Sequence, residues 1–235
     1  TRTRISETGA MSDSPVWPPN GDYLYFGSSV SGDWNIYRKR VYGGAPPERI
    51  GFPDGATEVG PLDISPDGKW LLTTANPGTT GWDFWLVRLD GEAFEWSPWL
   101  SSSSVEDQAR FSSDGRWIVY TSNTSGQPEV YISPVEGGAE VRQILVSVNG
   151  GSDPAWSPTG EAIYYRDSVG SLVRVDVRTD DDRIELSTPE RIAEIVPPSV
   201  GFLRNAYDVY PDGRSIVAFV DTGGRAPAIR IRTGW

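Results

Sequence analysis

Three ionisable residues of this 235-residue chain stand at one fixed distance before a glycine that recurs along the sequence. Asp63, Arg110 and Asp208 each lie five positions ahead of it. Two carboxylates in one cavity can serve as the general acid and base of a glycosidase. An arginine beside them holds carboxylates ionised, and no glycosidase motif accompanies them. We therefore expect these side chains to line a central channel without a catalytic role.

A second polar set lies near eight positions before the same glycine and supplies mostly oxygen atoms. Its members are Asp13, Glu58, Asp107, Ser152, Asp153 and Asn205. Gathered in one concave and partly dry place, such groups can bind a cation, a basic peptide or a sugar. Alternatively, they cap strand ends and bind water. The sequence predicts a binding site at the mouth of the channel, with no metal and no cofactor.

The chain contains no histidine and no cysteine. The absence of histidine excludes Ser-His-Asp and Cys-His machinery within this chain, together with the common histidine zinc sites. Without cysteine, no disulfide holds the fold. We therefore predict that the chain is not an enzyme.

Acidic residues outnumber basic ones by 32 to 21, which gives a formal net charge of -11. A nucleic-acid surface needs clustered Lys and Arg, so this balance argues against nucleic acid as a partner. It argues equally against an anionic membrane surface, and no apolar run approaches the length of a membrane span. The expected partner is a protein, a peptide or a small ligand, and an acidic mouth favours cationic ones.

The elements that position these residues are repeated. The recurring glycine belongs to a phrase made of an apolar residue, Ser-Pro-Asp-Gly or a near match, and a short apolar run. It stands at Gly21, Gly68, Gly115, Gly160 and Gly213, in steps of 47, 47, 45 and 53 residues. Repeats of this length made of short strands are typical of propeller blades. Asp67, Asp114 and Asp212 are expected to cap this turn rather than to bind metal.

The second repeat shows the plan of a blade. Extended segments at 60–65, 70–74, 83–89 and 94–100 are separated by turn or loop residues, among them Asp90-Gly91. This order makes a four-stranded antiparallel meander. The predicted blades of a single all-β domain span about 14–50, 60–100, 107–147, 152–196 and 205–232.

The last blade has only three expected strands. The segment 2–6 resembles those that precede later repeats, so we expect it to be the missing strand. Pairing the two ends of the chain in one sheet leaves no open edge. The prediction is a closed five-bladed β-propeller in which the N-terminal strand completes the last blade.

Apolar residues occupy two fixed positions around each glycine. Four positions before it stand Trp17, Ile64, Phe111, Trp156 and Val209, and three positions after it stand Leu24, Leu71, Ile118, Ile163 and Ile216. We expect these side chains to pack between blades, because a single blade exposes both faces. Trp82, Trp96 and Trp99 do not recur in this way, and their alternative role is to stack on sugars, as in a lectin.

The segments PAWSPTGEAIYY (154–165) and LDISPDGKWLLTTANPGTTGWDFWLVRLDG (62–91) resemble the WD-repeat-like propeller motif of TolB proteins. The later repeats are also similar to propeller regions attached to bacterial transmembrane serine/threonine kinases. The resemblance implies a bacterial binding or sensing module, located in the periplasm or otherwise outside the cytoplasm as part of a larger protein. Similar blades occur beside peptidase domains, so the alternatives are the propeller part of a hydrolase, a small glycosidase and a lectin.

Overall fold

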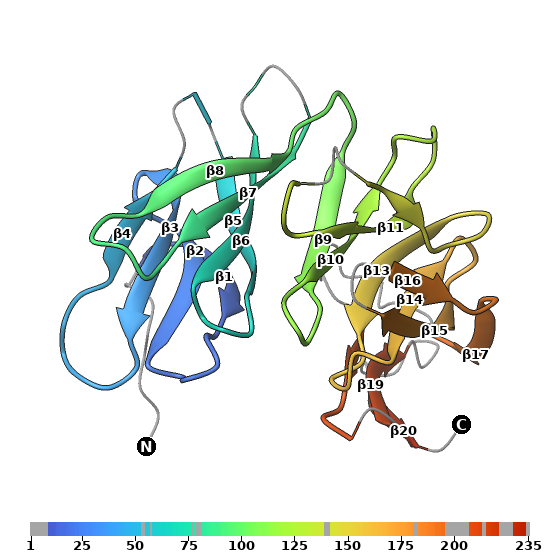
Figure 1. The fold of residues 1–235 in the computed structure, drawn as a ribbon. Helices are drawn as coiled ribbons and strands as arrows, with labels where there is room; N and C mark the ends of the chain where they lie inside the picture. Colours follow the sequence, from blue (N-terminus) through green and yellow to red (C-terminus); the bar gives the residue numbers. More distant parts are fainter. Residues whose placement is uncertain are drawn as a thin grey trace.

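The computed structural model describes residues 9–52, 55–56, 58–76, 78, 81–138, 142–180, 183–195, 207–212, 215–220 and 228–233, with only the backbone at 219–220 and 228–233. These residues form antiparallel β-sheets and no helix. Figure 1 shows the sheets following one another in chain order, with the first and the last at the two ends of an arc.

The first two sheets are four-stranded meanders with the orders β1-β2-β3-β4 and β5-β6-β7-β8. The first contains β1 (Ser12–Val16), β2 (Tyr23–Ser31), β3 (Asp33–Arg40) and β4 (Glu48–Gly51). The second contains β5 (Glu58–Ile64), β6 (Trp70–Asn76), β7 (Asp83–Arg88) and β8 (Glu95–Leu100).

The third sheet repeats this plan, with the order β9-β10-β11-β12. It contains β9 (Glu106–Phe111), β10 (Trp117–Ser122), β11 (Glu129–Pro134) and β12 (Ile144–Leu145). The last sheet has three described strands in the order β18-β19-β20. They are β18 (Tyr207–Val209), β19 (Ser215–Val220) and β20 (Ala228–Thr233).

The fourth sheet departs from the predicted four strands because it carries an additional hairpin. It contains β13 (Gly151–Trp156), β14 (Ala162–Asp167), β15 (Ser171–Asp180), β16 (Arg183–Leu186) and β17 (Glu190–Glu194). The first half of β15 pairs with β17, and its second half pairs with β16. The long strand β15 therefore extends beyond its own sheet.

The repeated glycine forms the predicted tight turn between the first two strands of a sheet. The amide of Gly68 donates to the carbonyl of Ser65 at 2.8 Å, and the amide of Gly115 donates to that of Ser112 at 2.9 Å. Gly115 has a φ of 72°, which favours a residue without a Cβ. Asp114 Oδ1 accepts from the Arg116 amide at 3.0 Å. The turn-capping role predicted for this aspartate is confirmed.

The other two aspartates that precede the repeated glycine, Asp67 and Asp212, cap their turns in the same way. Asp67 Oδ1 accepts from the Lys69 amide at 3.1 Å, and Asp212 Oδ1 accepts from the Ser215 amide at 2.8 Å. These carboxylates satisfy backbone donors at the start of a strand.

The inner strands β1, β5, β9 and β13 each contain a bulge seven positions before the glycine. Ser14, Gln108 and Asp153 have φ values of 49°, 59° and 54°, which are rare for residues other than glycine. The register of β1, β9 and β13 against its neighbour shifts at these places. In β5 the equivalent residue is Pro61, whose ring fixes φ, yet the register shifts there too. A bulge re-aims side chains, so it changes the direction of the side chains at the start of these four strands.

The two faces of the second, third and fourth sheets pack on two different neighbours. Leu71, Ile118 and Ile163 are fully buried, and each lies in a cluster with the preceding sheet. The residue after each of them points the other way. Leu72 clusters with the third sheet, and Val119 clusters with the fourth. Alternation along one strand therefore joins each sheet to both neighbours.

The predicted contact between the last sheet and the first is not present among the described strands. Contacts between strands join each sheet to the next one along the chain. No contact of comparable extent joins the described strands β18–β20 to β1–β4. The predicted N-terminal strand at 2–6 lies outside the described residues. Trp17 is 53% exposed, whereas Trp156 at the equivalent position is 9% exposed.

Replacing Gly115 with alanine tests the turn. A Cβ there would lie 3.3 Å from Pro66 Cδ in addition to the strained φ of 72°. We expect the free energy of unfolding to fall by about 1–2 kcal/mol in a urea titration. Gly44→Ala is the matched control, because a Cβ at Gly44 meets nothing within 4 Å. Equal stabilities of the two variants would contradict the turn's importance.

Candidate functional site

Four inner strands surround a cavity of about 190 Å³. Asp63 from β5, Arg110 from β9, Ala155 from β13 and Asp208 from β18 line it, all five positions before their glycine or its equivalent. Arg110 also lines a neighbouring cavity of about 270 Å³, together with Val16 of β1. The structure thus brings the predicted channel-lining residues around one space.

Asp63 joins two sheets through its carboxylate. Its Oδ2 accepts from the Phe111 amide of the next sheet at 2.9 Å, and its Oδ1 accepts from the Ile64 amide at 2.9 Å. Burial raises the pKa of Asp63, while the Arg110 charge and these two amides act in the opposite direction. Both oxygens are committed to the backbone, so the arrangement serves sheet packing rather than acid–base catalysis.

A polar cluster lies at the starts of β9 and β13. The Asp153 amide donates to Gln108 Oε1 at 2.8 Å, and Gln108 Nε2 donates back to Asp153 Oδ1. Arg166 of β14 pairs with Asp153 Oδ2 at 2.8 Å, and its Nη2 lies 3.4 Å from Ser152 Oγ. Gln108 and Asp153 are the bulge residues of β9 and β13, so these two bulges bring the side chains together. We call Asp107, Gln108, Ser152, Asp153 and Arg166 the mouth cluster.

Charges in the mouth cluster influence one another. Burial raises the pKa of Asp153, Arg166 opposes this, and the Asp107 charge adds to it. Tyr207 of the last sheet donates to the Asp153 carbonyl at 2.6 Å. Burial also raises the pKa of Tyr207 well above its ordinary value, so this hydroxyl stays neutral. Arg166 Nε is buried and finds no hydrogen-bond partner within the described part of the chain.

The remaining predicted mouth residues are not part of the mouth cluster. Asp13 and Glu58 are exposed near the starts of β1 and β5. Asn205 lies outside the described residues. Sequence reasoning missed Gln108, Arg166 and Tyr207, since their positions carry no recurring residue type.

The tryptophans proposed for sugar stacking belong largely to the core. Trp99 is buried against Phe84 and Tyr120, and its Nε1 donates to the Val135 carbonyl at 3.1 Å. Trp96 packs on the cluster between the first two sheets. The face of Trp99 is therefore not available to a sugar, which excludes the sugar-stacking alternative for this residue.

Solved structures share this architecture. The crystal structure of TolB from Acinetobacter baumannii superposes with a TM-score of 0.68 at 18% identity, covering 97% of this chain and 53% of that one. A TolB-named structure from Agrobacterium tumefaciens gives 0.65 at 20% identity, covering 97% of this chain and 79% of that one. The chain has a TolB-like β-propeller fold. This likeness concerns the fold alone.

Two curated proteins are similar in sequence. "Uncharacterized peptidase YuxL" of Bacillus subtilis is 35% identical over 91 residues, which make up 37% of this chain and 14% of that protein. "Uncharacterized protein Atu1656" of Agrobacterium fabrum is 27% identical over 202 residues, covering 68% of this chain and 67% of that protein. The chain thus spans a small part of the peptidase. No family model matches it.

Neither a metal centre nor a membrane helix is visible in the described ranges. No group of three or more acidic ligands that could hold a metal ion occurs there. No helix there is long and apolar enough to cross a membrane.

The buried carboxyl of Asp63 predicts a dependence of stability on pH. Because its pKa is raised from 3.8 in the folded state, the folded chain holds the proton more tightly than the unfolded chain. The resulting stabilisation is complete below about 3.8 and is lost as pH rises through the folded pKa. As pH rises from about 3.8 through the folded pKa, the free energy of unfolding of the parent should fall relative to that of Asp63→Asn. Urea titrations across this pH range measure the difference.

Asp208→Asn is the matched control, because Asp208 occupies the equivalent position but is exposed. Its stability should follow that of the parent across the same pH series. Parallel curves for the parent and Asp63→Asn would show that the carboxyl does not titrate in this way.

Proposed function

We propose that the chain is a non-catalytic binding module whose mouth cluster takes a protein or peptide carrying a basic side chain. The observation that carries this proposal is the mouth cluster itself, in which Asp153 pairs with the Arg166 guanidinium and the Asp107 charge lies close enough to act on Asp153. Asp13 and Glu58 add two exposed negative charges at the starts of inner strands. The excess negative charge favours a cationic group.

The mouth also offers a hydrogen-bond donor. Arg166 Nε is buried without a described partner, although Arg166 Nη2 is paired with Asp153. An unpaired buried donor is costly, and a backbone carbonyl of a bound peptide would satisfy it. A basic side chain next to a peptide carbonyl therefore fits this site better than a free cation does.

We further propose that the ring closes between the last sheet and the first, giving five blades with segment 2–6 as the outer strand of the last. Leu24, Phe26 and Tyr37 support this, because they are buried although their described cluster comes from the first sheet alone. On the last sheet, Ile216 and Ala218 pack on the fourth sheet, so Val217 points to the opposite face. Closure would bring that face onto Trp17.

A second candidate is the propeller part of a larger peptidase, and the likeness to the Bacillus subtilis protein named as a peptidase favours it. In that case this chain would still be the non-catalytic part, because it has no histidine or cysteine. The fold resemblance also supports a role outside the cytoplasm within a larger protein. Both versions assign binding, not chemistry, to the mouth.

Charge neutralisation at the mouth tests the proposed function. The probe is a hexalysine peptide, titrated calorimetrically at low and at physiological salt. We expect Asp13→Asn with Glu58→Gln to weaken binding about threefold to tenfold at low salt, with a smaller difference at physiological salt because of screening.

Asp90→Asn with Glu92→Gln is the matched control. It also removes two negative charges, but from the exposed turn between β7 and β8. Equal weakening by both pairs would show attraction to net charge alone. The absence of binding to the parent would contradict the cationic partner.

A further inference from the structure

A third cavity lies between the third and fourth sheets, at the opposite end of the inner strands from the mouth cluster. It has a volume of about 330 Å³, within the range of small-ligand sites. Its walls come from the turn after β9, the turn after β13 and the far half of β15. Only the fourth sheet, among those described, carries the extra hairpin that supplies this third wall.

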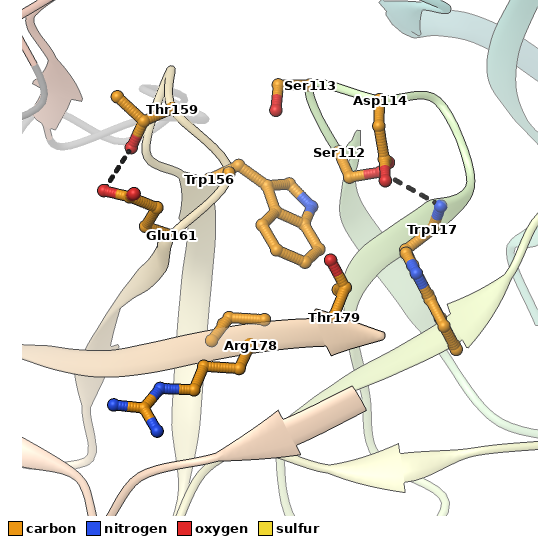
Figure 2. A pocket seen from close by; sticks show the side chains of 11 residues that line it. Ser112, Ser113, Asp114, Trp117, Trp156, Thr159, Glu161, Arg178 and Thr179 are labelled. Atoms are coloured by element: carbon orange, nitrogen blue, oxygen red, sulfur yellow. Dashed lines mark hydrogen bonds between the residues drawn. The ribbon is translucent and has the colours of Figure 1, made fainter. Parts of the chain in front are cut away.

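Two tryptophans in this cavity hold unpaired donors. Trp117 is 4% exposed and Trp156 is 9% exposed, and neither Nε1 has a hydrogen-bond partner among the described residues. Figure 2 shows the nitrogen edge of Trp156 turned toward the side of the cavity where Trp117 and Asp114 lie. Trp85 Nε1 is also unpaired but lines none of the three cavities. Buried indole N–H groups normally find a partner, so two unpaired ones in one cavity call for an acceptor.

Other groups around the cavity define the ligand further. Asp114 and Glu161 place carboxylates on opposite sides, and the Thr179 hydroxyl faces the space between them (Figure 2). The guanidinium of Arg178 extends away from the cavity in the same view. The carboxylates disfavour an anion, because like charges repel. Asp114 is already paired with Arg116 Nε at 2.8 Å, and the lining also includes Arg178, so the charges around the cavity are close to balance. A neutral ligand that accepts from indole N–H groups and donates to Glu161 therefore fits this lining.

A saccharide meets these requirements. Each sugar hydroxyl accepts and donates hydrogen bonds, so one hydroxyl can accept from an indole N–H while another donates to a carboxylate. We propose that this cavity, between the turns at Ser112–Asp114 and Thr159–Glu161, binds a neutral mono- or disaccharide. The site is independent of the mouth cluster, and nothing in the repeating blade plan requires it.

The test uses the whole chain and four probes: glucose, N-acetylglucosamine, maltose and cellobiose. We expect at least one of them to bind with a Kd of about 1 mM or tighter by calorimetry. The same sugar should shift the indole N–H resonances of Trp117 and Trp156 in ¹H–¹⁵N spectra, assigned with single Trp→Phe variants. Trp156→Phe keeps an aromatic ring but removes one donor, so affinity should fall about fivefold to tenfold.

Two further variants distinguish a loss of sugar binding from a loss of folding. Thr179→Val changes an exposed hydroxyl on β15 and should weaken binding without altering the melting temperature. Trp99→Phe is the control, because its indole N–H donates to Val135 and lies outside the cavity. Asp13→Asn with Glu58→Gln should leave sugar binding unchanged, which separates this site from the mouth. Failure of all four sugars to bind, or equal affinity of Trp156→Phe and the parent, would overturn the proposal.

Discussion

The structure depends on burial of sheet faces by the neighbouring sheets. An isolated four-stranded sheet of this composition would expose apolar side chains on both sides, at a cost of about 25 cal/mol per Å². Ile118 on one face of β10 and Val119 on the other are both fully buried, because the second and fourth sheets cover them. No single sheet is stable by itself, and the order of the sheets follows the order of the chain.

This packing is what gathers polar side chains from distant parts of the sequence. Successive inner strands lie next to one another because their sheets do, so Asp63 reaches the Phe111 amide 48 residues later. The bulges then turn Gln108 and Asp153 toward each other across two sheets. Without the sheet contacts, neither the cavity around Arg110 nor the mouth cluster would exist.

The repeated features were predictable from the sequence. Asp114 and Gly115 specify a local turn, whose chemistry depends on adjacent residues, and alternating apolar residues specify the buried faces. Arg166 and Tyr207 could not be recognised, because each acts through a partner on another strand that no local pattern reveals. The step of 53 residues after Gly160 is longer than the other steps, but the use of the added chain as the hairpin β15–β16 depends on tertiary pairing.

Cross-linking of the first and last sheets tests the central claim most directly, and the cysteine-free chain makes it simple. Trp17 and Val217 occupy the positions that share one core cluster in each successive pair of sheets, as Trp156 and Val119 do. Trp17→Cys with Val217→Cys, treated with a short bismaleimide, should give an intramolecular cross-link. Leu145→Cys with Val217→Cys, which uses an exposed outer-strand residue, should give none. Cross-links found only between two chains, or none for the first pair, would contradict a ring closed by its own last sheet.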